Sequence, residues 1–119
     1  MPGPYQLVDY TAKNNVAFSD PVQITDEDDV EIDVSAYEFR FTVRDEVGGT
    51  ALVSLTEVSS PDSVEREGGG FVTPTITSAT MGGLSPTVCV YDWLWKGAAT
   101  GNDWQLLQEG KFIVEEGIS

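Results

Sequence analysis

One segment of the chain alternates aromatic and charged residues so regularly that it is best explained as a β-strand. Its apolar positions are Tyr37, Phe39, Phe41 and Val43. Charged and hydroxyl side chains occupy the positions between them. Successive side chains of a strand point to opposite faces, so one face would carry three rings and a valine while the other meets water. Such a strand covers a core with one face, which predicts a layered β fold.

The rest of the chain repeats this pattern of short strands between turns. Clusters of Gly, Pro, Asp and Ser separate the alternating segments. The predicted strands are residues 6–11, 22–25, 30–33, 36–44, 51–58, 71–77, 87–94, 104–108 and 111–114. Residues 60–67 are the only helical candidate, because no other window approaches the spacing of an amphipathic helix. The sequence predicts an all-β, antiparallel β-sandwich, Ig-like or jelly-roll-like, with few or no helices.

Glycines indicate how the strands connect. Gly48 and Gly49 separate two predicted strands and indicate a hairpin with a glycine turn. Residues 97–103 form a second loop, between the strands at 87–94 and 104–108. Gly110 interrupts the last alternating stretch, which predicts a bulge or bend followed by one final strand.

Length and composition indicate a single folded unit. A chain of 119 residues with 40% apolar residues is long enough to bury one core without disulfides or metals. We expect one β-sandwich domain over residues 1–119, with residues 1–5 as an extended arm. The first residues lack the basic start and apolar centre of a secretory signal, so we expect a protein made in the cytoplasm.

Net charge excludes several classes of partner. Twenty acidic residues against six basic ones give a formal charge of −14. Phosphate backbones and anionic membranes would be repelled by such a surface, so neither nucleic acid nor membrane is an expected partner. An acidic protein with few lysines is also typical of concentrated salt, where self-repulsion is screened. The composition therefore favours a halophilic source, although an acidic mesophilic domain remains the alternative.

Residues for catalysis are scarce. The chain has no histidine, which removes the most common general acid and base near neutral pH. Cys89 is the only cysteine and lies inside a predicted strand without a nearby base, so we interpret it as a buried structural thiol. Paired carboxylates for glycoside hydrolysis remain open, because their separation depends on the fold. We expect no enzyme activity and no cofactor, and a small enzyme ranks last among the hypotheses.

Acidic residues after the second predicted strand are the one weak metal candidate. Asp26, Asp28 and Asp29 lie in a run of oxygen ligands of the kind that Ca²⁺ or Mg²⁺ prefers. The spacing differs from an EF-hand, because Glu31 stands where that loop needs glycine and Tyr37 where it needs glutamate. We interpret the run as a solvated acidic turn.

Three tryptophans flank one loop near the C-terminal end. Trp93, Trp95 and Trp104 lie on either side of residues 97–103. In a small sandwich, tryptophans commonly fill the core or a subunit interface. A sugar ring can also stack on exposed tryptophans, so a carbohydrate- or receptor-binding module that uses these three residues is the alternative function.

Two parts of the chain resemble small β-sandwich virion proteins of tailed viruses, found in baseplates, tail fibres and head decorations. The first is residues 29–44, where an acidic and apolar stretch leads through Ser-Ala-Tyr into the aromatic strand and ends in Arg. The second is the C-terminal half. There Leu84-Ser-Pro-Thr-Val-Cys-Val-Tyr-Asp is similar to the family pattern Leu-x-Pro-Gly-x-Tyr-x-Tyr-Asp, and residues 106–114 are similar to Leu-Leu-x-Gly-x-Phe-x-Val. Thr87 and Cys89 depart from it, since the family has glycine and commonly an aromatic residue there.

The resemblance implies a non-enzymatic virion structural protein that binds copies of itself and other virion proteins, as a homo-oligomer in the particle. The acidic composition would then indicate a virus of a halophilic host. The resemblance does not say whether the protein belongs to the head, as a decoration, or to the tail or baseplate. Termini and loops reach neighbouring subunits most readily. The predicted contact residues are therefore Tyr5, Trp93, Trp95, Asn102, Asp103 and Trp104.

Overall fold

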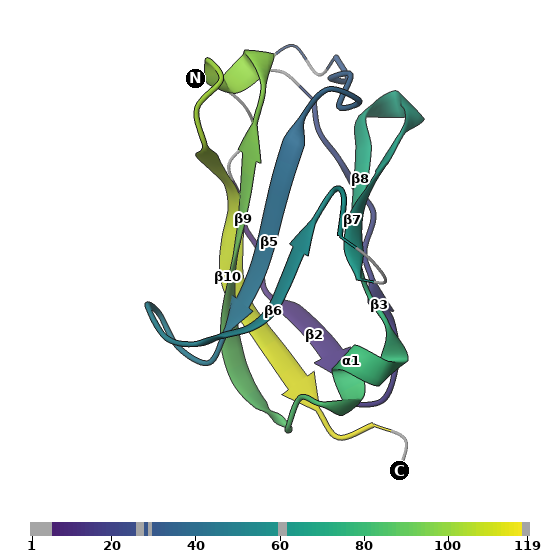
Figure 1. Ribbon diagram of the computed structural model, residues 1–119, viewed down its shortest axis with the longest axis vertical. Helices are drawn as coiled ribbons and strands as arrows, with labels where there is room; N and C mark the ends of the chain where they lie inside the picture. The colour runs from purple at the N-terminus through teal and green to yellow at the C-terminus, as the bar shows by residue number, and fades with distance from the viewer. Residues whose placement is uncertain (1–5, 26–27, 29, 60–61, 118–119) are drawn as a thin grey trace.

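Two β-sheets face each other in the computed structural model, which describes residues 6–25, 28, 30–59 and 62–117. One sheet has six strands and the other four. Figure 1 shows β5, β9 and β10 in one layer and β3, β7 and β8 in the other. Strands of both layers contribute buried apolar side chains to one core. The predicted all-β sandwich is confirmed.

The six-stranded sheet contains the long strands. β9 lies between β5 and β10 and is antiparallel to both, while β1 and β2 run parallel to β10 at one edge and β6 forms the other edge. Its strands are β1 (Gln6–Leu7), β2 (Tyr10–Lys13), β5 (Glu38–Arg44), β6 (Ala51–Thr56), β9 (Thr87–Lys96) and β10 (Gln105–Glu115). The two predicted hairpins, β5–β6 and β9–β10, are confirmed.

The four-stranded sheet is assembled from shorter pieces around β8. β7 pairs with one side of β8, and β3 and β4 pair with different ends of its other side. The strands are β3 (Phe18–Ser19), β4 (Val22–Gln23), β7 (Ser63–Glu67) and β8 (Phe71–Ile76). Three consecutive glycines, Gly68–Gly70, make the tight 3₁₀ turn from β7 into β8, and two of them have positive φ angles that glycine adopts without strain.

Aromatic rings from β5 and β9 form the centre of the core. Their inward positions are nearly inaccessible to solvent, as the alternation in both sequences requires. The Phe41 ring stacks on Tyr91 with centroids 5.1 Å apart and meets Trp93 edge to face at 5.5 Å. Tyr37 stacks on Trp95 at 5.3 Å. Burial of such rings supplies the largest apolar area per residue, so this face stabilises the sandwich.

Two of the local predictions are wrong. Residues 60–67 were the helical candidate, but residues 63–67 form strand β7, because pairing with β8 satisfies their backbone groups. Residues 30–33 form no strand, and only an isolated bridge joins Thr25 to Glu31. The chain also contains a short helix that was not predicted, α1 (Ser78–Gly82), which begins where Thr77 Oγ1 accepts a hydrogen bond from Thr80 N.

The expected bulge near the end of the chain lies elsewhere. β10 continues through Gly110, which pairs with Tyr91, and the register shifts between Leu106 and Gln108 instead. Gly110 is needed for a close approach, since a Cβ atom there would lie 2.1 Å from Val8 O. The glycine therefore lets the segment between β1 and β2 cross β10 closely. No helix in the described ranges is long and apolar enough to cross a membrane.

Candidate functional site

The three tryptophans do not form one surface. Trp93 and Trp95 point into the core from β9 and are 0% and 1% exposed. Only Trp104, which precedes β10, is partly exposed. The prediction that Trp93 and Trp95 contact a partner is therefore wrong, and a sugar-stacking platform of all three side chains is not formed. The signal was in the sequence, because both residues share the face of β9 that carries Cys89 and Tyr91.

Trp104 lies under two cationic side chains on the outside of the six-stranded sheet. The guanidinium carbon of Arg40, on β5, is 4.1 Å from the centroid of the Trp104 ring. Lys96 Nζ, on β9, is 5.8 Å from the same centroid and 3.8 Å from Glu38 Oε2. A cation over an indole face is attracted by the negative face of the ring. Arg40 and Trp104 therefore hold each other in place at the surface.

The loop before Trp104 presents the two other predicted contact residues. Asn102 and Asp103 are both exposed, directly before Trp104 in the chain. The loop is fixed by hydrogen bonds to Gly97 O, which accepts from Asn102 N at 2.9 Å and from Thr100 N at 3.1 Å. These two residues thus lie beside Trp104 at one end of the sheet, and their contact with a partner stays a prediction. Tyr5, the remaining predicted contact residue, lies outside the described residues.

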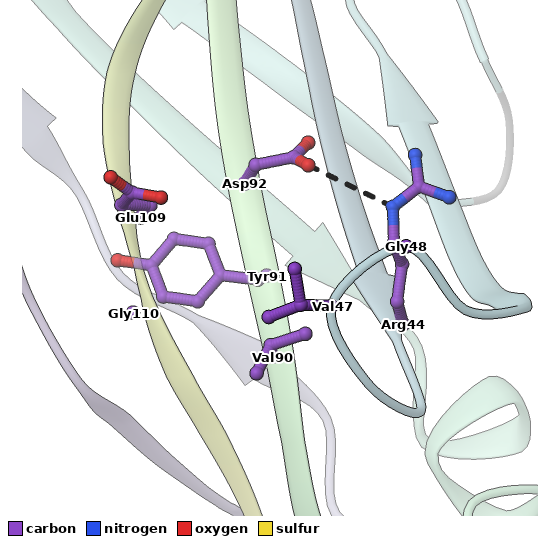
Figure 2. Close-up of a pocket in the computed structure, with 8 residues that line it drawn as sticks. All are labelled: Arg44, Val47, Gly48, Val90, Tyr91, Asp92, Glu109 and Gly110. Carbon is purple, nitrogen blue, oxygen red and sulfur yellow. Dashed lines mark ion pairs between the residues drawn. The ribbon is translucent and has the colours of Figure 1, made fainter.

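A hollow lies further along the same outer surface, below the β5–β6 turn. Figure 2 shows Val47 of this turn above Val90, with the Arg44–Asp92 ion pair beside them. Arg44 Nε and Asp92 Oδ2 are 3.7 Å apart. The hollow has a volume of about 260 Å³, slightly below the range of ordinary small-molecule sites. Its size and its valine side chains suit a protein contact better than a substrate.

Charge is distributed unevenly between this surface and the rest of the molecule. We define the outer sheet face as the side chains of β2, β5, β6, β9 and β10 that point away from the core. Five of the six basic residues lie on it: Lys13, Arg40, Arg44, Lys96 and Lys111. The acidic residues on it are Glu38, Asp92, Glu109 and Glu115.

Formal charges of the two parts have opposite signs. Five basic and four acidic residues give the outer sheet face a charge of +1, and the remaining one basic and sixteen acidic residues give the rest of the chain −15. The face also exposes apolar area, since Val88 is 55% and Leu52 is 42% exposed. Strand alternation indicated only that each of these basic side chains points outward, because each lies one position from an inward residue of its strand; that their strands share one sheet is a property of the fold.

Ionisable groups in the core are held neutral. Desolvation by burial, assisted by the charge of Asp45, raises the pKa of the Cys89 thiol. This side chain is 1% exposed, so the prediction of a buried structural thiol is confirmed. Burial likewise raises the pKa values of Tyr10 and Tyr91, whose hydroxyls donate to Gln108 Oε1 at 2.9 Å and Val8 O at 2.6 Å. These hydroxyls stabilise the core and are placed away from solvent.

Carboxylates do not converge on one point among the described residues, where no group of three or more Asp, Glu or Cys side chains is placed to hold a metal ion. Asp28 is exposed, and the two other metal candidates, Asp26 and Asp29, lie outside the described residues. No protein-family model matches the chain, and no curated protein matches it. The strongest candidate for function is therefore the outer sheet face.

Proposed function

We propose that the protein is a non-enzymatic structural subunit of a tailed virus particle, in its head or tail, and that the outer sheet face binds an acidic surface of a neighbouring subunit. The observation that carries the proposal is the separation of charge, +1 on this face and −15 on the rest. The resemblance of residues 29–44 and 106–114 to virion modules supports a tailed virus particle as the assembly. The acidic composition supports a virus of a halophilic host.

Electrostatics favours this face as the contact. Two bodies with a large negative charge repel each other, and repulsion falls where one of them presents positive charge. Complementary potentials also select the orientation of partners and disfavour wrong ones. The acidic remainder of a neighbouring copy, or of another virion protein, is a suitable partner surface. The exposed acidic remainder would also keep finished particles dispersed.

Arg40 and Trp104 are the expected centre of the contact. Arginine and tryptophan are the residue types most enriched among the side chains that dominate binding energies. Neither of the ion pairs between described residues involves Arg40, so its N–H donors remain available for a carboxylate. Its position over the Trp104 ring, at 4.1 Å, reduces the entropy that binding would cost.

The contact is tested with substitutions at its centre. Trp104→Ala and Arg40→Glu should abolish assembly of the purified protein with its particle partner while circular dichroism remains that of the folded chain. Ala79→Ser, at an exposed and uncharged position of α1 outside both the outer sheet face and the acidic residues, is the control and should assemble normally. Unaltered assembly of both contact variants would show that this face is not the interface.

Membership of a particle is tested separately by quantitative mass spectrometry of purified virions. About one copy per major capsid subunit would indicate a head decoration, and a few per cent would indicate the tail or baseplate. Absence from the particle would overturn the virion proposal. A change of tryptophan fluorescence with glycans would then favour the carbohydrate-binding alternative, through Trp104.

A further inference from the structure

The edge strand β6 lacks the usual protection against pairing with another chain. Its sequence, Ala-Leu-Val-Ser-Leu-Thr, contains neither a charged residue nor a proline. Charged side chains and prolines are the common devices that prevent edge strands from pairing. The other strands of four or more residues each contain one or both. An unprotected edge in such a highly charged chain indicates that β6 pairs with a strand of another chain.

Backbone geometry shows which groups of β6 are available. Thr56 donates its N–H to Ser59 Oγ at 2.9 Å, so this N–H points away from β5. Backbone groups of an antiparallel strand point alternately toward and away from its neighbour. The N–H and C=O of Ser54 therefore also point away from β5. Leu52 has no partner in the β5–β6 register, which shifts beside it.

Apolar side chains surround this edge. Leu52 is 42% exposed, and the turns before and after β6 expose Val47 at 87% and Val58 at 79%. These are three of the six large apolar residues that the described ranges expose. A strand that pairs along this edge would remove the apolar area of Leu52 from water. The backbone and the side chains thus indicate the same location.

We propose that β6 pairs with β6 of a second copy, antiparallel and across a two-fold axis at Val53, so that the two six-stranded sheets become continuous. In this register Leu52 lies opposite Ser54 of the second copy, and Ser54 opposite its Leu52. Ser54 is the residue whose N–H and C=O point away from β5 by this alternation. Thr56, which Ser59 already occupies, is not required. The contact is isologous, because the same strand contributes on both sides.

The uncharged edge of β6 makes a second copy a suitable partner at this place. A chain of net charge −14 repels its own copy wherever acidic surfaces meet. Pairing about Val53 places only uncharged residues of the two β6 strands opposite each other, so no carboxylates face each other within the paired strands. Added salt should therefore strengthen this contact by screening the rest of the two molecules. Binding through the outer sheet face should instead weaken with salt, which distinguishes the two contacts.

The pairing adds a second type of contact to the proposed function and does not depend on it. A dimer joined at β6 leaves the outer sheet face of both copies accessible. One isologous and one charge-driven contact together would allow subunits to extend into a symmetric array. Dimerisation is measured on the isolated protein, whereas particle membership is measured on virions, so the two proposals fail independently.

The experiment is sedimentation equilibrium of the purified chain and four variants, at low and high salt. We expect a dimer that tightens with salt. Leu52→Lys introduces two charges at the junction, and Ser54→Pro removes an outward N–H without a ladder bond to β5. Each should weaken dimerisation by about tenfold or more. Val88→Lys, an equally exposed apolar residue on β9, and Ser54→Thr, which keeps the N–H, are the matched controls and should dimerise normally.

Hydrogen exchange provides a second readout that does not need a variant. The amides of Leu52 and Ser54 should gain protection as protein concentration rises, while the amide of Val88 should not. A monomer at every concentration and salt, or a dimer that Leu52→Lys leaves intact, would overturn the proposal. So would capture of β6 by a strand of a different virion protein in place of self-pairing.

Discussion

The two sheets of this sandwich are stabilised in different ways. In the six-stranded sheet, long strands bury rings, and Phe41 alone contacts Tyr91, Trp93 and Phe112. In the four-stranded sheet, strands of two to six residues are held by side chains that bind backbone groups. Asp62 and Arg66 do this at the two ends of β7. The difference teaches that the six-stranded sheet supplies most of the buried rings, whereas the four-stranded sheet adds bonds from polar side chains to backbone groups.

The largest effect should come from the rings of the six-stranded sheet. Trp93→Ala removes a side chain that is 0% exposed and should lower the free energy of unfolding by about 3–5 kcal/mol. Trp93→Phe should cost much less, because it keeps a ring and removes an indole N–H that has no hydrogen-bond partner. Urea denaturation measures both. Equal losses for the two variants would mean that ring burial is not the main contribution.

A close backbone approach in the same sheet should give the next largest effect. Gly110→Ala would place a Cβ atom 2.1 Å from Val8 O, so β10 and the chain before β2 must separate. Forced overpacking of this kind costs about 1–3 kcal/mol. Thermal unfolding measures the loss. Gly101→Ala is a control for an open position, with no atom within 4 Å of its Cβ, although its φ of 69° adds some strain. A smaller loss for Gly110→Ala than for this control would contradict the account.

Sequence predicted the six-stranded sheet better than the four-stranded one, for a physical reason. Strands such as β5 and β9 have one buried face, so burial imposes the alternation that a reader can see. β7 has only one buried residue, Val64, and four polar ones. Its strand conformation comes from pairing with β8, and no pattern within residues 63–67 reveals that pairing. Residues 30–33 are the opposite case. Their sequence alternates like a strand, but apart from the Thr25–Glu31 bridge they pair with no described neighbour.

The candidate site was predictable in part. Trp104, Asn102 and Asp103 were identified because loops present residues at the surface. Trp93 and Trp95 were assigned to a contact although their strand alternation placed them with buried Cys89. The separation of charge could not be read directly, because it needs the four strands that carry these basic residues, β2, β5, β9 and β10, to be in one sheet. Pairings between distant segments supply that information.

Acid should loosen the four-stranded sheet first. Asp62 accepts hydrogen bonds from Thr77 N at 2.7 Å and Thr80 Oγ1 at 2.6 Å, next to α1. Desolvation alone would raise the pKa of Asp62, but these hydrogen bonds outweigh it and lower the pKa. A lowered folded-state pKa means that the contribution to stability is complete above the unfolded value of about 3.9 and is lost as pH falls through the folded value.

Asp62→Asn tests this contribution. At neutral pH it should cost about 1–2 kcal/mol, because the charge-assisted bonds to Thr77 and Thr80 are weakened. Below about pH 4 the difference between the variant and the natural chain should begin to shrink, and it should be lost once pH falls below the lowered folded-state pKa, where Asp62 is protonated in both states. Chemical denaturation across pH measures it. A difference that stays constant down to pH 2 would show that the carboxylate charge is not the cause.

The smallest effect, and the most direct comparison of the sheets, concerns Arg66. Although exposed on β7, its Nη1 donates to Ser35 O and Tyr37 O, both at 2.9 Å, and so ties the four-stranded sheet to the residues that lead into β5. Arg66→Ala should cost about 0.5–1 kcal/mol, because solvent competes for exposed bonds. Lys111→Ala should cost less, because the side chain of this exposed cation on β10 makes no hydrogen bond or ion pair with another described residue. Equal losses would mean that the sheets are joined by apolar packing alone, whereas a greater loss for Arg66→Ala, with faster exchange of the Tyr37 amide, would show that a polar bond contributes to the junction.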